Sequence, residues 1–278
     1  MHEKGESQMK LKIGFSAGQF GEERAPAALP EQPAPVRQSL VQVHFPARNL
    51  TLSYYNDSFP LKVGDLVYVD GKLEGLRGRV TGITYHFKIK LSDYKRVIAV
   101  ADTQVRGRFY FAGSHFVTFD PSALPYSKAV TWFKAPERED EVYACGSDDT
   151  GFLLDDLSTM DIRAEIAERG HAYYAESRVC YLCLDGTKGR AIVEGTQPYE
   201  LEFAYRDGEI LNLTCGCFCS YPCKHEFAAM LQLRETLAYI TKHYASHYEA
   251  SGCFAAVSKD TLLRAAIDGK EGGSILLE

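Results

Sequence analysis

The stretch Cys215-Gly-Cys217-Phe-Cys219-Ser-Tyr-Pro-Cys223-Lys-His225 places four cysteines and a histidine within eleven residues. Two of the thiols form a Cys-x-Cys pair, and a Cys-x-His pair follows after a gap of five residues. Three thiolates and one imidazole are the ligand set of a structural zinc site, in which four tetrahedral ligands leave no position open for water. The stretch therefore predicts a bound Zn²⁺ ion that stabilises structure and performs no chemistry.

The geometry of strands and helices is consistent with one shared ion. Residues i and i+2 of a strand point to the same face, so Cys215 and Cys217 can aim at one ion where a strand ends. The glycine between them lets the backbone approach closely. The residues after His225 are good helix formers with apolar side chains near helical spacing. We therefore expect His225 in the first turn of a helix, close to the thiol of Cys223.

Cys219 is a fifth candidate ligand, which could replace one of the others or lie outside the site as a free thiol. The alternative for the whole cluster is a set of disulfides or buried thiols. A secreted disulfide scaffold of this length usually carries a signal peptide, and Met1-His-Glu-Lys-Gly-Glu is not apolar. We therefore favour zinc and a reducing, cytoplasmic environment.

The pattern resembles the SWIM-type zinc-finger family, in which a Cys-x-Cys pair, a variable gap and a Cys-x-His pair follow a group of strands. The segments Gly170–Val179 and Ala191–Phe203 look like those strands in bacterial members. The resemblance covers about residues 158–240. It implies that the four metal ligands are Cys215, Cys217, Cys223 and His225. Cys219 is then not a ligand.

The resemblance also bears on function. Members of this family occur in chromatin-remodelling-type ATPases, in transposase-related proteins and in recombination factors, and their zinc module is described as binding DNA or protein. It therefore implies a protein partner, such as a helicase or ATPase or a recombination-type assembly, and no catalysis. This chain has no Gly-x-x-x-x-Gly-Lys-Ser/Thr phosphate loop, so we expect it to carry no ATPase and to be no enzyme.

Charge is distributed unevenly along the 278 residues. Residues 40–110 carry 11 Lys and Arg against 6 Asp and Glu, a balance of +5, whereas residues 140–250 carry 9 against 19, a balance of −10. Phosphate-driven binding of DNA or RNA needs a basic surface. Direct nucleic-acid binding by the amino-terminal half is therefore the alternative function. Its candidate residues are Arg77, Arg79, Lys88, Lys90, Lys95 and Arg96.

Short alternating runs fill the amino-terminal half, beginning with Leu40–Phe45 and Leu50–Tyr54, and we expect a further strand at Phe87–Leu91. Several short strands separated by glycine turns are typical of a small β-barrel. The run Leu61-Lys-Val-Gly-Asp-Leu-Val-Tyr-Val69, followed by Gly78-Arg-Val-Thr-Gly-Ile83, is similar to the signature of SH3-like barrels in nucleic-acid and translation proteins. The predicted fold class is α+β, with a small SH3-like barrel followed by an α+β domain that contains the SWIM finger.

The expected organisation has five parts: a tail at 1–36 that is disordered or forms an edge strand, a small β-barrel at 37–111, a connecting region at 112–157, the SWIM zinc-finger domain at 158–240 and a carboxy-terminal helical extension at 241–278. No run of 18 apolar residues occurs, so we expect no membrane partner.

Five smaller patterns complete the sequence-based expectations. Ser158-Thr-Met-Asp161 looks like a capping box that opens a helix at Thr159–Arg169, with Gly170 after its end. Ser258 and Gly269 are expected to bound a last short helix. Cys180 and Cys183 are interpreted as buried strand thiols, and the pair His243 and His247 as a solvated helix end. Asp148, Asp149, Asp155 and Asp156 are adjacent loop carboxylates with no sign of convergence.

Overall fold

The computed structural model describes residues 36–136, 146, 151–217, 219, 221–269 and 276–277. All of them belong to one compact unit, Pro35–Glu278. Residues 1–35 of the expected tail lie outside the described residues, as do Cys145, Asp148 and Asp149. None of the described helices combines the length and the apolar character that a membrane span needs.

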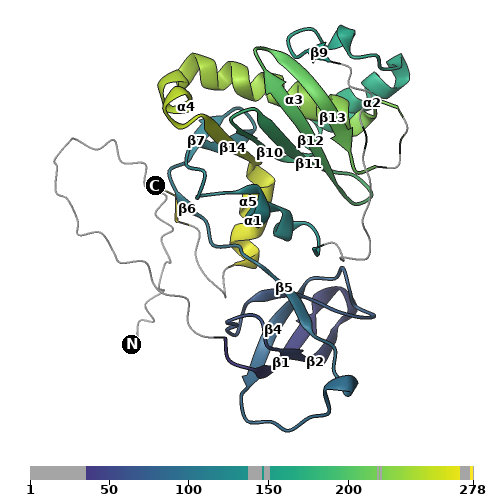
Figure 1. Cartoon of the computed structure of the whole chain (residues 1–278), viewed down its shortest axis with the longest axis vertical. Helices are drawn as coiled ribbons and strands as arrows, with labels where there is room; N and C mark the ends of the chain where they lie inside the picture. The colour runs from purple at the N-terminus through teal and green to yellow at the C-terminus, as the bar shows by residue number, and fades with distance from the viewer. Residues whose placement is uncertain are drawn as a thin grey trace, which may run out of the picture. The chain divides into compact units, whose positions relative to one another are not determined.

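The amino-terminal part is a five-stranded antiparallel sheet (Figure 1). Its strands are β1 (Ser39–Phe45), β2 (Leu50–Asn56), β3 (Leu66–Val69), β4 (Gly78–Thr84) and β5 (Val97–Ala101), in the order β2-β1-β4-β3-β5. The alternation seen in the sequence places Val41, Val43 and Phe45 on the core side of β1, where all three are fully buried. Gly78 lies so close to Val43 that a Cβ there would come within 2.4 Å of it.

The expected closed barrel is not formed, because within the described part of the chain no ladder joins β2 to β5. Among the described residues, their two edges meet at an isolated parallel bridge between Tyr55 and Arg96. The strand expected at Phe87–Leu91 is instead irregular and leads into a 3₁₀ turn, η2 (Leu91–Asp93). The ring of Phe87 packs edge-on against Tyr55, with centroids 6.1 Å apart. The alternation of residues 87–91 predicted strand pairing, but the segment is held by this side-chain contact instead.

The second sheet has eight antiparallel strands in the order β7-β8-β14-β10-β11-β12-β13-β9. Their bounds are β7 (Tyr110–Ala112), β8 (His115–Thr118), β9 (Phe152–Leu153), β10 (Val179–Asp185), β11 (Lys188–Glu194), β12 (Pro198–Arg206), β13 (Glu209–Cys215) and β14 (Cys253–Ser258). A separate parallel pair joins β6 (Arg106–Gly107) to β15 (Leu276–Leu277).

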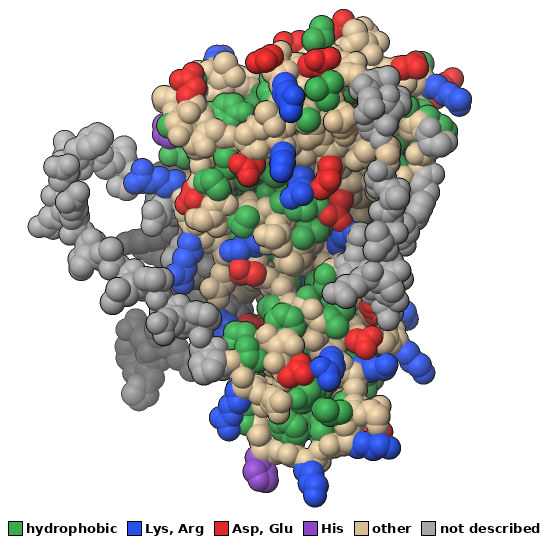
Figure 2. All heavy atoms as spheres, in the orientation of Figure 1, with side chains coloured by type: hydrophobic (Ala, Val, Ile, Leu, Met, Phe, Trp, Pro, Cys, Tyr) green, Lys and Arg blue, Asp and Glu red, His purple; other side chains and the backbone are tan. Residues whose placement is uncertain are grey.

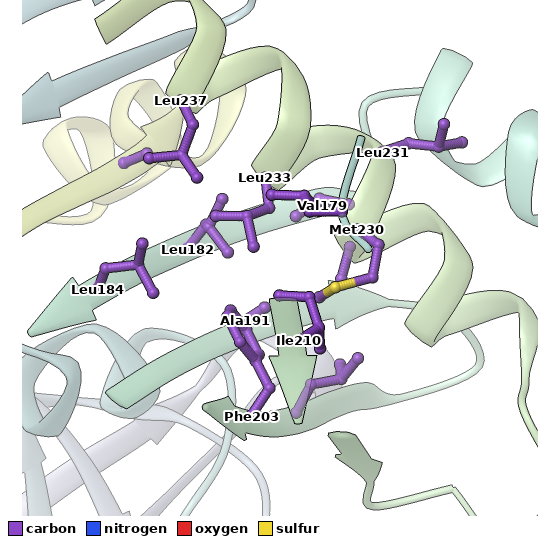
Figure 3. Packing of buried hydrophobic residues seen from close by; sticks show 14 of the residues in the cluster. Val179, Leu182, Leu184, Ala191, Phe203, Ile210, Met230, Leu231, Leu233 and Leu237 are labelled. Carbon is purple, nitrogen blue, oxygen red and sulfur yellow. The ribbon is translucent and has the colours of Figure 1, made fainter. Parts of the chain in front are cut away.

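Helices cover both faces of the eight-stranded sheet. They are α1 (Tyr126–Ala129), α2 (Ala164–Ala175), α3 (Lys224–His243), α4 (Ala245–Ser251) and α5 (Lys259–Asp268), with further 3₁₀ turns η1 (Pro46–Arg48), η3 (Val130–Trp132) and η4 (Leu157–Thr159). On one face, Met230 and Leu233 of α3 pack onto Val179 and Leu182 of β10 (Figure 3). On the other face, Tyr181 packs in a cluster with Trp132 of η3 and with Leu262 of α5.

This sheet crosses the boundaries that we expected at 157 and 240. Strands β7 and β8 come from near the expected connecting region, and β14 comes from the expected helical extension. β14 joins β8 to β10, and all six of its residues are buried. The expected final helix is confirmed as α5, since the Ser258 hydroxyl accepts a hydrogen bond from the Thr261 N–H and Gly269 follows its last residue.

Helix α2 differs from the expectation at both ends. It begins at Ala164, and the predicted capping box lies beside the 3₁₀ turn η4, where the Asp156 side chain accepts a hydrogen bond from the Ser158 N–H. Gly170 is not its terminator but a buried residue inside it. A Cβ at Gly170 would lie 2.8 Å from the Phe227 ring, so the glycine is needed where α2 crosses α3.

Candidate metal centre

The first pair of thiols lies at the end of strand β13. Its last residue, Cys215, lies opposite Leu201 of β12. The next peptide is tied to the same strand, because the Gly216 N–H donates a hydrogen bond of 2.9 Å to the Glu200 carbonyl. The Cys219 N–H then donates to the Cys217 carbonyl at 2.8 Å. These two bonds fold the chain into a tight knuckle at the end of a strand, as the Cys-x-Cys spacing predicted.

The beginning of α3 delivers the second pair. Cys223 is the N-cap, and its Sγ accepts a hydrogen bond of 3.5 Å from the Glu226 N–H. The Glu226 carboxylate in return accepts a bond of 2.6 Å from the Cys223 N–H. This reciprocal capping box fixes the first turn. His225 therefore lies one residue into the helix, as expected, and its ring is directed by a rigid element.

The two pairs converge on one point. One ligand atom from each of Cys215, Cys217, Cys223 and His225 lies within 4.8 Å of the others. His225 Nδ1 is 3.8 Å from the Cys215 Sγ and 3.7 Å from the Cys223 Sγ. Ligand atoms around a tetrahedral ion with bonds of about 2.0–2.3 Å lie roughly 3.4–3.8 Å apart. The cluster is therefore compatible with a bound metal ion, with Nδ1 as the imidazole ligand.

Cys219 does not belong to this four-residue cluster. Its side chain is exposed, whereas Cys223 is buried. It nevertheless lies beside the site, because its backbone N–H donates a hydrogen bond to the Cys217 carbonyl. The fifth cysteine of the motif is thus a solvent-facing neighbour of one ligand.

The electrostatics of the pocket favour neutral side chains when no cation is present. Burial, followed by the charge of Cys223, raises the pKa of the Cys217 thiol to about 12. A hydrogen bond with Cys215, followed by burial, raises the pKa of Cys223. Burial, followed by Lys224 and Arg169, lowers the pKa of His225 to about 4. His225 is therefore a neutral imidazole at pH 7, the form that binds metals, and a cation would be needed to hold the thiols as thiolates.

Aromatic rings enclose the imidazole of His225. The Tyr199 ring stacks on it with centroids 4.2 Å apart and an interplanar angle of 23°, and the Tyr173 ring meets it edge-on at 5.5 Å. Its Nε2 is buried and has no hydrogen-bond partner within the described part of the chain. Ring orientation is thus set by stacking rather than by the carboxylate or carbonyl that often orients a metal-bound histidine.

Cations and tyrosines alternate around the knuckle, a feature that the sequence analysis missed. Lys224 and Arg178 both lie over the Tyr173 ring, at 4.4 and 4.9 Å from its centroid, and Arg163 lies over Tyr221 at 5.2 Å. Charge counted over residues 140–250 gave −10, which concealed this local group. Only the fold brings these residues together, since they come from α2 and the residue before it, from the loop before β10, and from α3 and the loop before it.

The six residues predicted for nucleic-acid binding fall into two groups. Arg77 forms an ion pair with Asp268 of α5 and donates to the Trp132 carbonyl at 3.1 Å. Arg79 donates to the carbonyls of Gly64 and Asp268, both at 3.0 Å. These two arginines therefore attach the amino-terminal sheet to α5, and their hydrogen-bonding groups are engaged within the protein.

The other four residues lie together on the connection between β4 and β5, and each is exposed: Lys88, Lys90, Lys95 and Arg96. Arg96 pairs with Asp57 at 2.8 Å and lies 5.4 Å from the centroid of the Tyr55 ring. The nitrogen of Lys95 is 3.9 Å from a carboxylate oxygen of Asp70. The basic connection, residues 85–96, is thus the part of the predicted set that faces solvent.

The remaining candidates stay structural. His243 ends α3 and His247 lies in α4, where it packs against the ring of Tyr110 at 5.1 Å. Cys180 and Cys183 are strand thiols, as expected, and burial raises the pKa of both, to about 11 for Cys180. No second cluster of three or more potential metal ligands occurs in the part of the chain that the structure describes.

Comparisons with models of known protein families, with curated proteins and with solved structures give no match for this chain.

Proposed function

We propose that this is a cytoplasmic zinc protein whose Cys₃His knuckle is a SWIM-type finger, and that the finger is an interaction module in a DNA- or RNA-associated protein assembly. The observation that carries the proposal is the closed set of four ligand atoms within 4.8 Å, with His225 Nδ1 directed at two sulfurs. Three thiols and an imidazole select Zn²⁺ among common ions, and four ligands leave no position for a substrate or water. The module therefore binds a partner and has no catalytic role.

The surroundings of the knuckle support the interaction role. Arg163, Arg178 and Lys224 lie against tyrosine rings beside the metal ligands. Arginine and tyrosine are enriched at protein interfaces, because they combine apolar contact with polar groups. Thiolate ligands also need a reducing compartment, which is why we place the protein in the cytoplasm.

The test has two arms. Elemental analysis of the purified protein should give one zinc per chain. The partner captured from the native host should then be lost when Arg163 and Lys224 are both replaced by glutamate, while the zinc content stays the same. Lys242→Glu, at the far end of α3, is the matched control and should retain the partner. Absence of zinc from the purified protein, or full retention of the partner by the double variant, would contradict the proposal.

A second candidate function is direct nucleic-acid binding by the basic connection. Four cations there are exposed, and this end of the molecule, formed by the five-stranded sheet, displays more basic than acidic side chains (Figure 2). We retain the SH3-like assignment of that sheet as part of this proposal. The bridge between Tyr55 and Arg96, which brings its two edges together, supports a barrel-like strand order.

Salt dependence tests this second candidate. Binding of a labelled oligonucleotide should weaken as salt rises, with a log–log slope of about 0.7–0.9 for each phosphate contact. Replacing Lys88 and Lys90 by glutamine should reduce that slope by roughly 1.4–1.8. Replacing Arg77 by glutamine should leave the slope unchanged, because that side chain is paired with Asp268. A slope that the Lys88 and Lys90 changes do not alter would exclude this surface.

A further inference from the structure

Strand β2 forms one edge of the five-stranded sheet, and its first half is exposed. The four residues Leu50–Ser53 are all exposed, whereas the last three residues of the strand are buried. Leu50 and Leu52 are 40% and 41% exposed. They lie opposite Phe45 and Val43, which are fully buried. Directly opposed residues of an antiparallel pair share a face, so both leucines extend the apolar core side of the sheet to its open edge.

The backbone of this edge is also available for pairing. The Tyr55 N–H donates a hydrogen bond to the Lys95 carbonyl, on the side of β2 that faces away from β1. Outward-facing backbone groups alternate along a strand, so Thr51 and Ser53 present their N–H and C=O groups on the same side. Neither has a backbone partner on that side among the described residues.

The edge lacks the features by which proteins usually block strand pairing. Leu50–Asn56 contains no charged residue and no proline, and these are the residues that protect natural sheet edges. The segment Leu50-Thr-Leu-Ser-Tyr54 also reads apolar–polar–apolar–polar–apolar in both directions about Leu52. It is therefore complementary to an antiparallel copy of itself.

We propose that β2 pairs with β2 of a second copy of this chain, antiparallel and across a two-fold axis at Leu52. Thr51 then lies opposite Ser53 of the other copy, and the same pairing repeats by symmetry, so that the outward N–H and C=O groups bond to one another. Leu52 faces its own counterpart, and Leu50 faces Tyr54. The pairing ends where Asn49 takes a left-handed conformation, with φ of 47°. Because of this turn, each chain bends away from the strand before it would meet the Lys95 carbonyl of the other copy.

The decisive experiment uses the self-opposition of residue 52. Sedimentation velocity of the full chain should show a species of twice 31.0 kDa as concentration rises. Leu52→Lys and Leu52→Glu should each dissociate it, weakening association by at least about tenfold, because like charges directly opposite in a sheet are destabilising. An equimolar mixture of the two variants should restore the dimer, since lysine then faces glutamate.

Leu263→Lys is the matched control. Leu263 is 61% exposed but lies on α5, away from the edge, so this variant should dimerise like the unchanged chain. Circular dichroism and zinc content, equal in all variants, show that each one is folded. A monomer at every concentration, whatever else covers the edge, overturns the proposal. So does an equimolar mixture of the Lys and Glu variants that stays monomeric, because that result excludes the axis at residue 52.

Discussion

At the scale of single residues, the candidate metal centre depends on side chains that burial keeps neutral. His225 is the clearest case, because burial lowers its pKa to about 4 and its Nδ1 lies between two sulfurs. Burial acts on the thiols in the opposite direction, because it raises the pKa of Cys217 to about 12 and so favours the protonated thiol. A divalent cation would replace the protons of the thiols and hold them as thiolates. Cys219 lies outside this four-residue cluster, so we do not expect it to hold the ion.

Serine substitutions separate the ligands from that neighbour. We expect Cys219→Ser to retain one metal ion per chain, because four converging ligand atoms remain. Cys217→Ser is the matched change two residues away, and it should lower metal affinity by orders of magnitude, since a hydroxyl is a poor ligand for zinc. Elemental analysis after dialysis against a weak chelator measures both. Loss of metal from Cys219→Ser would show that the ligand set is different from the one assigned here.

His115 makes stability depend on pH through its burial. The side chain is completely buried, its Nε2 lies 2.7 Å from the Val179 carbonyl, and its Nδ1 lies 2.9 Å from the Ser114 hydroxyl. The pKa of His115 is lowered, and burial is the largest cause. The charge of Glu235 acts in the opposite direction, and the charge of Lys259 acts in the same direction as burial. The unfolded chain therefore binds a proton first as pH falls below about 6.5, so this residue destabilises the native state progressively in acid.

We expect His115→Gln to reduce that dependence on pH. Urea unfolding at pH 7 and pH 5 should show a smaller loss of unfolding free energy in the variant than in the unchanged chain. Both proteins contain the same four candidate metal ligands, so comparing them removes any effect of metal release in acid. His247→Gln, an exposed histidine, is the control and should behave like the unchanged chain. An equal or larger loss in His115→Gln would contradict the assignment.

At the scale of elements, the first turn of α3 combines helix capping with metal binding. Cys223 is both the N-cap and a candidate ligand, and Glu226 completes the capping box. The remainder of the helix is anchored independently, because Phe227, Met230 and Leu233 pack in the core of the second sheet. The helix therefore holds two of the four ligand atoms at a fixed distance from the end of β13.

Glu226→Ala tests that connection. The loss of its carboxylate leaves the Cys223 N–H without its capping partner, which should cost about 0.5–2 kcal/mol of unfolding free energy. It should also weaken metal binding, because the loop before Cys223 becomes freer. Glu226→Gln retains an acceptor and should cost less. Denaturant unfolding and competition with a chromogenic chelator measure the two effects. Unchanged metal affinity in Glu226→Ala would show that the helix cap does not contribute to metal binding.

At the scale of the whole molecule, the two sheets have separate apolar cores. Val41, Val43 and Val67 belong to the core of the five-stranded sheet, while the ligand-bearing elements pack into that of the eight-stranded sheet. The free energy of metal binding in small zinc sites is on the order of 10 kcal/mol. Its loss should therefore affect mainly the knuckle and the first turn of α3, which carry the four candidate ligands.

Hydrogen exchange with and without a zinc chelator tests this expectation. Exchange should accelerate over residues 213–227 and change little in β1, which belongs to the other core. The later part of α3, from Ala228 to Ile240, should stay protected, because it is buried against the second sheet. Cys223→Ala without chelator should reproduce the same pattern. Protection of residues 213–227 that survives chelation would mean that the metal is not structural.

The sequence by itself predicted the elements whose signals are local. The strand that ends at Cys215, the helix that begins after Cys223 and the helix bounded by Ser258 and Gly269 all follow from spacing, helix propensity or capping. The four candidate ligands lie within eleven residues, so a strand end and a helix start are enough to bring them together. A mixed α and β composition was predictable for the same reason.

Only the tertiary structure decided which elements share a sheet and which charges face solvent. Cys253–Ser258 contains alanines and no clear alternation, and it becomes a central strand because β8 and β10 pair with it on both sides. Gly170 looked like a helix terminator, but it is the point where α2 crosses α3. Arg77 is engaged by Asp268, which is 191 residues away. Packing, pairing and charge neutralisation at such separations depend on the folded arrangement, and no local pattern in the chain encodes them.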